Sequence, residues 1–149
     1  MLEQFDLVIT IGVVEHFDEL SRATNALAAF LKPGGLVYTQ IPNLSSSVGR
    51  LCKLLNKPIY ELHNPHNLSS LVTGHEQAGL TVLESSPIGS TGFHVLSACL
   101  DNDTTTAQRL LYYALVAVTR ATDFWESSLF PLPRTQALSP LLYCIGKKD

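Results

Sequence analysis

The stretch from Phe5 to Gly35, FDLVITIGVVEHFDELSRATNALAAFLKPGG, constrains the fold more than any other part of the sequence. Its residues 7–11 form a short, apolar and mostly β-branched run, which is typical of a parallel strand covered on both faces. Gly12 ends this run, and the ionisable pair Glu15 and His16 follows just past the strand. In open α/β sheets, ligands bind beyond the carboxyl ends of the strands. The pair is therefore a candidate site.

An amphipathic helix is predicted to follow this turn. Asp18 is placed to cap its first turn. Apolar residues then recur with helical spacing, at Leu20, Ala23, Leu27, Phe30 and Leu31. The run Lys-Pro-Gly-Gly at 32–35 predicts the end of this helix, and residues 36–41 predict a second strand.

The rest of the chain predicts alternating helices and strands. In order, we expect a helix starting at the serines 45–47, an irregular polar loop over 56–67, a short helix capped by Ser69 and closed by Gly79, a strand over 80–84, an apolar helix containing 110–118 and a final strand over 141–146. Residues 93–100 fit either a strand or a helix. This alternation predicts an α/β fold.

Composition excludes several classes of protein. Hydrophobic residues make up 46% of the 149 residues and charged residues 15%, which excludes a disordered chain. The net charge of −3 and the lack of a basic cluster argue against a nucleic-acid partner. Cys52, Cys99 and Cys144 are widely spaced in apolar context, as expected of buried free thiols. The apolar run 110–118 is too short to span a bilayer and fits a buried or partner-packed helix. Because MLEQFD leads almost directly into a strand, we expect no signal peptide and a cytoplasmic location.

The order of these motifs resembles the second half of the class I S-adenosylmethionine-dependent methyltransferases. The similar features are the strand beginning Phe-Asp, the Val-Glu-His turn at 14–16, the Leu-Lys-Pro-Gly-Gly helix end and a strand running into Ile-Pro-Asn at 41–43. The resemblance implies a partial Rossmann-like sheet of about four strands with flanking helices and a lid helix. It places the strands in the order first, second, last, third, with only the last antiparallel, and leaves the outer edge of the first strand bare. It also implies that residues 1–149 are a single domain truncated at its amino end, with 101–137 a helical lid before the last strand.

The cofactor implied by this resemblance is S-adenosylmethionine. By resemblance Ile11, Gly12 and Val13 face the cofactor, and Gly12 lets it approach closely. Cofactors of this kind require a Gly-rich turn and a carboxylate some 20 residues further on, and the sequence shows neither. We therefore expect the isolated chain to bind the cofactor poorly or not at all.

The ionisable residues of the candidate site have two interpretations. Glu15 and His16 either line the junction of cofactor and methyl acceptor, with His16 as a base or orienting group, or they serve the turn and the helix start. Some related ubiquinone-pathway O-methyltransferases carry an E-x-x-E-H run that can bind a metal. Because the first of those positions is Gly12 here, we predict no metal site. His63 and His66 have H-x-x-H spacing but are separated by Pro65, so they fit solvated loop histidines, with a substrate-facing His66 as the alternative.

The resulting hypothesis is methyl transfer from S-adenosylmethionine to a small, hydrophobic acceptor molecule. The alternative is a non-catalytic, methyltransferase-like module that pairs its bare strand edge with itself as a homodimer or with a partner chain. A third interpretation is a gene fragment without independent activity.

Overall fold

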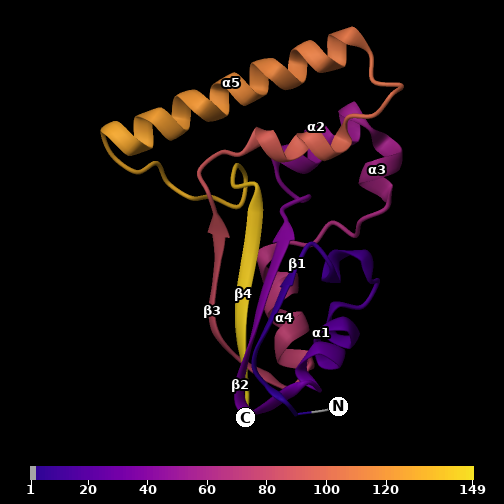
Figure 1. Ribbon diagram of the computed structural model, residues 1–149, viewed down its shortest axis with the longest axis vertical. Helices are drawn as coiled ribbons and strands as arrows, with labels where there is room; N and C mark the ends of the chain where they lie inside the picture. Colours follow the sequence, from indigo (N-terminus) through magenta and orange to yellow (C-terminus); the bar gives the residue numbers. More distant parts are fainter. Residues whose placement is uncertain (1–2) are drawn as a thin grey trace.

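The computed structural model describes residues 3–149 as a mixed four-stranded sheet, with helices on one face and a long helix beyond one end (Figure 1). The elements in order are β1 (Phe5–Ile11), the 3-10 turn η1 (Val14–His16), α1 (Leu20–Ala28), β2 (Leu31–Pro42), α2 (Ser47–Leu55), α3 (Lys57–Glu61), α4 (Leu68–Gln77), β3 (Leu80–Ile88), the 3-10 segment η2 (Phe93–Cys99), α5 (Thr106–Ser128) and β4 (Leu141–Lys148). The predicted α/β fold class is confirmed.

The sheet has the strand order β1-β2-β4-β3. β1 and β2 run parallel, with Ile9 opposite Tyr38, whereas β4 pairs antiparallel with both β2 and β3. The predicted order and the single antiparallel strand are thus both correct. The sequence-distant β4 lies in the middle of the sheet, between two strands that precede it in the chain.

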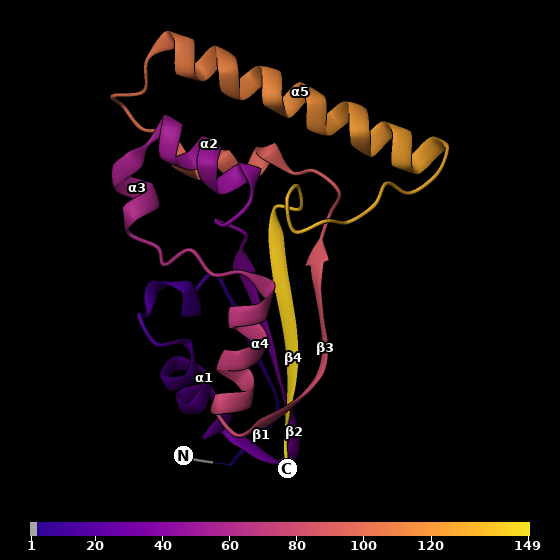
Figure 2. The same ribbon diagram turned by 180° about the vertical axis from the view of Figure 1, so that it is seen from behind.

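Helices α1 and α4 cover one face of the sheet (Figure 2). Side chains alternate along β2 and β4, so that Val37, Thr39 and Ile41 are buried beneath these helices together with Leu142 and Cys144. The buried strand residues and the apolar stripes of the two helices form the main core. This alternation is what a sheet covered on one side requires.

The opposite face of the sheet and the outer edge of β1 remain uncovered by the other elements of residues 3–149 (Figure 1). The side chains of β1 are correspondingly exposed, and Leu7, Ile9 and Ile11 are 49%, 59% and 60% accessible. The expected bare edge is therefore present. Three exposed aliphatic side chains on an edge strand, whose outer backbone edge is unpaired, form a surface that favours association with another chain.

A second, smaller core joins α2, η2 and one face of α5. It contains the side chains of Cys52 and Cys99, and Cys144 lies in the main core. All three cysteines are buried and free, as predicted. The ambiguous segment 93–100 is η2, neither strand nor α-helix.

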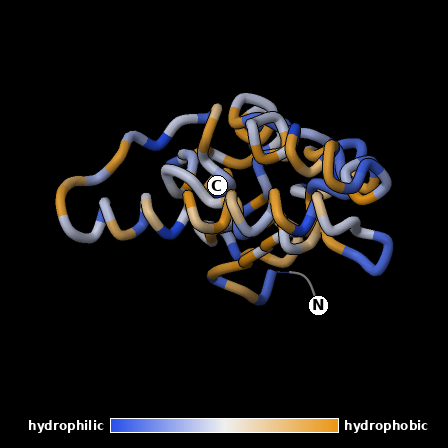
Figure 3. Tube along the Cα trace, turned by 90° about the horizontal axis from the view of Figure 1, so that it is seen from above, coloured by the Kyte–Doolittle hydropathy of each residue, from blue (hydrophilic) through white to orange (hydrophobic). Residues whose placement is uncertain are grey.

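Helix α5 is mostly exposed, so it is not a buried helix, and the alternative of a partner-packed helix stays a prediction. Thr119 is its one buried residue, and hydrophobic and hydrophilic residues are mixed along the helix (Figure 3). Exposed apolar side chains include Leu110, Tyr113 and Phe124. None of the helices in residues 3–149 combines the length and the apolar character that crossing a membrane requires.

Several predicted boundaries differ from the observed ones. Asp18 does not cap α1, because its carboxylate accepts a hydrogen bond from the Asn64 side chain instead. α1 ends at Ala28, and 32–35 form an irregularity inside β2 rather than the helix end. The cap of α4 is Asn67, which forms a reciprocal capping box with Ser70. Gly79 closes that helix with φ +78°, as predicted.

His75 is a structural residue of the main core. It is fully buried on α4, where its Nδ1 donates to the Leu71 carbonyl (2.8 Å) and its Nε2 accepts from the Thr39 hydroxyl (3.0 Å). Both ring nitrogens are therefore satisfied in the neutral form. Burial lowers the pKa of His75 below its ordinary value of 6.5.

We expect this buried imidazole to make the fold less stable in acid. Below pH 6.5 the unfolded chain takes up a proton at position 75, whereas the buried His75 of the folded chain resists protonation. The free energy of unfolding therefore decreases as the pH is lowered, by at most about 1.4 kcal/mol per pH unit for one proton. Urea unfolding at pH 7.5 and 5.5 measures this loss. His75→Gln should be less stable at pH 7.5 but should lose less between the two values. An equal loss in both proteins would assign the acid sensitivity to other groups.

Candidate functional site

The chain reverses sharply where β1 ends. Gly12 has φ +67°, a conformation that other residues rarely adopt. A Cβ placed on Gly12 would meet only one atom within 4 Å, Oε1 of Glu15 at 3.6 Å. Its neighbours Ile11 and Val13 are 60% and 45% exposed. The end of β1 thus presents bare backbone between two exposed aliphatic side chains.

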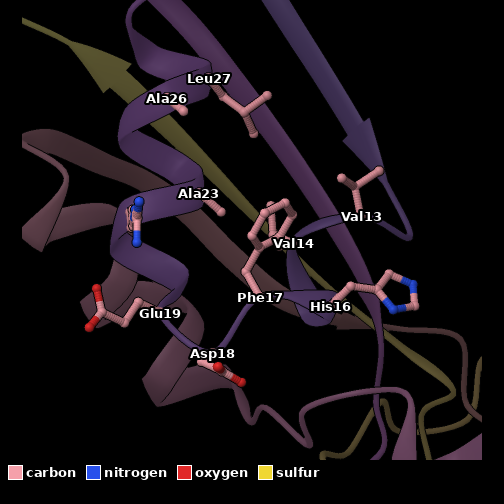
Figure 4. A pocket seen from close by; sticks show the side chains of 10 residues that line it. Val13, Val14, His16, Phe17, Asp18, Glu19, Ala23, Ala26 and Leu27 are labelled. Carbon is pink, nitrogen blue, oxygen red and sulfur yellow. The ribbon is translucent and has the colours of Figure 1, made fainter.

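A pocket of about 630 Å³ lies beside this turn, between the end of β1 and α1 (Figure 4). Its lining is mostly apolar, with Val13, Phe17 and Leu27 among its walls. Charged groups occur toward one side, from Asp18, Glu19 and Arg22. A pocket of this size and lining suits a small hydrophobic molecule with a polar group at one end.

Glu15 lies on the inner side of the turn and is only 2% exposed. Oε2 of its carboxylate is buried without a hydrogen-bond partner among residues 3–149. Desolvation raises the pKa of Glu15, while its own backbone amide and the neighbouring His16 and His63 pull this pKa downward. Glu15 is therefore a buried acid with one carboxylate oxygen left without a hydrogen-bond partner.

The segment after α3 is joined to the turn by hydrogen bonds. The backbone amide of Asn64 donates to the backbone carbonyl of Glu15 (2.8 Å), and Nδ1 of His16 donates to the Leu62 carbonyl (3.2 Å). This contact brings His63 beside His16, with ring centroids 4.5 Å apart. Glu15, His16 and His63 consequently form one cluster.

His66 lies apart from this cluster. It lines a second hollow between the starts of α1 and α4, together with Asp18 and Asn67. Its Nε2 is buried without a hydrogen-bond partner in the described part of the chain, and burial lowers the pKa of His66. Of the two histidines of the H-x-x-H pair, His63 therefore lies in the cluster with Glu15 and His16, and His66 lies in the second hollow.

His63 is a site residue that the sequence assigned to a solvated loop, away from Glu15 and His16. The polar loop predicted over 56–67 contains the five-residue helix α3, which starts at an Asn56 cap with Pro58 in its first turn. His63 follows this helix, and its Nδ1 donates back to the Ile59 carbonyl (2.9 Å). The Asn-Lys-Pro run at 56–58 is a helix-start signal that would have predicted this turn.

Solved structures show the fold that this chain shares. A methyltransferase from Thermotoga maritima that depends on S-adenosylmethionine (SAM) is 15% identical, with a TM-score of 0.61; the match covers 99% of this chain and 58% of that one. A SAM-dependent methyltransferase from Archaeoglobus fulgidus is 19% identical, with a TM-score of 0.54 and coverage of 99% and 61%. Haemonchus contortus phosphoethanolamine N-methyltransferase 2, in complex with S-adenosyl-L-methionine, is 13% identical, with a TM-score of 0.58 and coverage of 100% and 34%.

The chain therefore spans less than two thirds of the length of these structural relatives. No curated protein matches it. A family model described as a methyltransferase domain matches residues 2–85, which include every element from β1 to α4 and the start of β3. This match covers more than half of the chain and includes the whole candidate site. The chain belongs to the methyltransferase domain family.

Proposed function

We propose that this chain serves S-adenosylmethionine-dependent methyl transfer to a small, hydrophobic acceptor, and that the end of β1 forms one side of the site. The observation that carries the proposal is the Gly12 turn, where backbone without a side chain is exposed beside an apolar pocket. When bound, S-adenosylmethionine supplies an electrophilic methyl group. The protein contributes mainly by positioning the reactants.

The residues present fit one side of such a cofactor. Gly12 allows close approach of a ligand to the backbone, and the exposed Ile11 and Val13 offer apolar contact. A glycine-rich turn and a ribose-binding carboxylate are not recognisable in the 149 residues. We therefore propose a truncated domain in which residues 1–149 supply part of the cofactor contacts, with 101–137 acting as a helical lid.

Acid–base roles in this proposal go to Glu15, His16 and His66. The lowered pKa of His66 keeps its imidazole neutral near pH 7, so that its unpartnered Nε2 can accept a proton. The exposed His16 is at the mouth of the pocket and can orient an acceptor. The carboxylate of the neighbouring Glu15 can stabilise the His16 imidazole by electrostatic attraction.

Amide chemical shifts provide the test. The ¹⁵N-labelled chain is titrated with S-adenosylmethionine up to millimolar concentration, since only part of the contacts is present. We expect weak binding, no saturation at micromolar concentrations, and shift changes concentrated at residues 11–16. Saturable micromolar binding would contradict the truncated site. An absence of shifts at residues 11–16 at millimolar ligand would contradict the site itself.

A pair of matched glycine variants controls for backbone strain. Gly12→Ala and Gly34→Ala both place alanine at positive φ, +67° and +80°, in positions with room for a Cβ. Each should cost about 1 kcal/mol of stability. Only Gly12→Ala should diminish the shift changes, because only Gly12 lies at the proposed site.

A second candidate function is supported by the uncovered edge of β1. A non-catalytic module would use this edge to pair with a second copy or another chain. The exposure of Leu7, Ile9 and Ile11 supports this candidate.

A further inference from the structure

Three side chains with metal-binding atoms meet just past the end of β1, at Glu15, His16 and His63. One potential ligand atom from each residue lies within 4.8 Å of those of the other two. Glu15 and His16 belong to η1, whereas His63 is supplied by the segment that follows α3. The cluster therefore depends on the folded chain and not on a single sequence motif.

Both imidazoles are held by backbone carbonyls. Nδ1 of His16 bonds to the Leu62 carbonyl (3.2 Å), and Nδ1 of His63 bonds to the Ile59 carbonyl (2.9 Å). Because a carbonyl oxygen only accepts hydrogen bonds, Nδ1 carries the proton in each ring. Nε2 of each neutral ring then keeps a free lone pair. A backbone carbonyl bound to the second ring nitrogen is the usual support of a metal-ligating histidine.

One oxygen of the Glu15 carboxylate lacks a hydrogen-bond partner. Oε2 is buried without a hydrogen bond, and no salt bridge joins Glu15 to either histidine within residues 3–149. A buried carboxylate oxygen without a hydrogen-bond partner is costly. A cation bound between the carboxylate and the two lone pairs would remove that cost.

We propose that Glu15, His16 and His63 bind a divalent transition-metal ion, represented by Zn²⁺. This proposal replaces the expectation of no metal site, which considered Gly12 and not the approach of His63. Two imidazole nitrogens with one carboxylate suit zinc and its neighbours better than Mg²⁺ or Ca²⁺, which prefer oxygen ligands. Three protein ligands leave a coordination position open to water or to an oxygen of a small molecule. Ligand atoms of a tetrahedral zinc site lie about 3.4 Å apart, so the side chains must close in slightly. The exposure of His16 permits this movement.

Calorimetric titration of the metal-free 149-residue chain with Zn²⁺ tests the site in the absence of S-adenosylmethionine. We expect saturable binding of one ion per chain with a Kd in the micromolar range or below. His63→Ala and His16→Ala should each weaken binding at least tenfold. His94→Ala, which removes an exposed histidine of η2, should leave it unchanged. A folded wild-type chain that does not bind Zn²⁺, or a His63→Ala variant with wild-type affinity, would overturn the proposal.

Cobalt provides a second measurement that does not depend on affinity alone. Co²⁺ bound to the wild-type chain should give a visible absorption band typical of a four- or five-coordinate site, and Glu15→Gln should weaken or remove it. Gln keeps the shape of the buried side chain, so folding should be retained, as circular dichroism will verify. An unchanged cobalt spectrum in Glu15→Gln would exclude Glu15 as a ligand and overturn the proposed set. Because neither experiment contains the cofactor, their outcome is separable from that of the methyl-transfer proposal.

Discussion

Replacing Gly49 by alanine is expected to destabilise the folded chain by about 3 kcal/mol or more. A Cβ at Gly49 would lie 1.8 Å from the Leu44 carbonyl oxygen and 2.6 Å from the Leu44 Cα. In most helices the same change is favourable by up to about 1 kcal/mol. Here the obstacle is backbone, which cannot rotate away as a side chain can.

The turn that contains Leu44 is also unable to move away from α2, because hydrogen bonds hold it in place. The buried Asn43 donates from its side chain to the carbonyls of Gln136 (2.7 Å) and Ser139 (2.9 Å), and its amide donates to the Pro140 carbonyl (2.8 Å). These bonds connect the end of β2 to the segment before β4. Relief of the clash would therefore break buried hydrogen bonds.

Urea unfolding of Gly49→Ala measures this effect, with Arg50→Ala as the neighbouring control on the same helix. Arg50 is exposed, so its replacement should change the free energy of unfolding by less than about 0.5 kcal/mol. A Gly49→Ala variant as stable as the wild type would show that α2 can shift away from Leu44 without loss.

Ile9→Lys is expected to weaken self-association of the chain at least tenfold. Wild-type β1 carries exposed aliphatic side chains and an unpaired backbone edge, so two copies can pair their β1 strands across a twofold axis. A lysine at the centre of the strand would place a charge in this interface in both copies. Sedimentation velocity over a range of protein concentrations gives the association constant. A wild-type chain that stays monomeric would exclude β1 pairing.

The other edge strand offers the matched control. Leu83 on β3 is 55% exposed, close to the 59% of Ile9. β3 is protected, because its pairing is irregular between Val82 and Glu84 and because Pro87 cannot donate to a new strand. Leu83→Lys should therefore leave association unchanged. Equal effects of the two lysines would point to a general change in solubility instead.

The sheet could be predicted because its strands have strong local signals. The apolar run at 7–11, the strand after Gly35 and the final strand each show in hydrophobicity alone, and the resemblance supplied their order. Boundaries were less accurate where tertiary contacts compete with local preference. Asp18 is a good cap by type, but its carboxylate bonds to Asn64, a residue far along the chain.

The candidate site was only half predictable for the same reason. Gly12, Glu15 and His16 lie close together in the sequence, so their position at the strand end was evident. The approach of His63 depends on the Asn64–Glu15 and His16–Leu62 hydrogen bonds, which join segments distant in sequence. The hydrophobic periodicity of a sequence does not predict contacts between distant segments. The small pieces 57–61 and 93–99 are likewise too short for periodicity to identify.

The central position of β4 has a consequence for the order of folding during synthesis. As the chain leaves the ribosome, β1, β2 and β3 emerge first, yet β2 and β3 share no native hydrogen bonds and must wait for the strand between them. α5 also emerges before that strand, so a large apolar surface stays without its partner until the last strand appears. Partly folded chains that expose apolar surface in this way are prone to aggregate. Chaperone dependence should accordingly be greatest for nascent chains that stop just before Leu141.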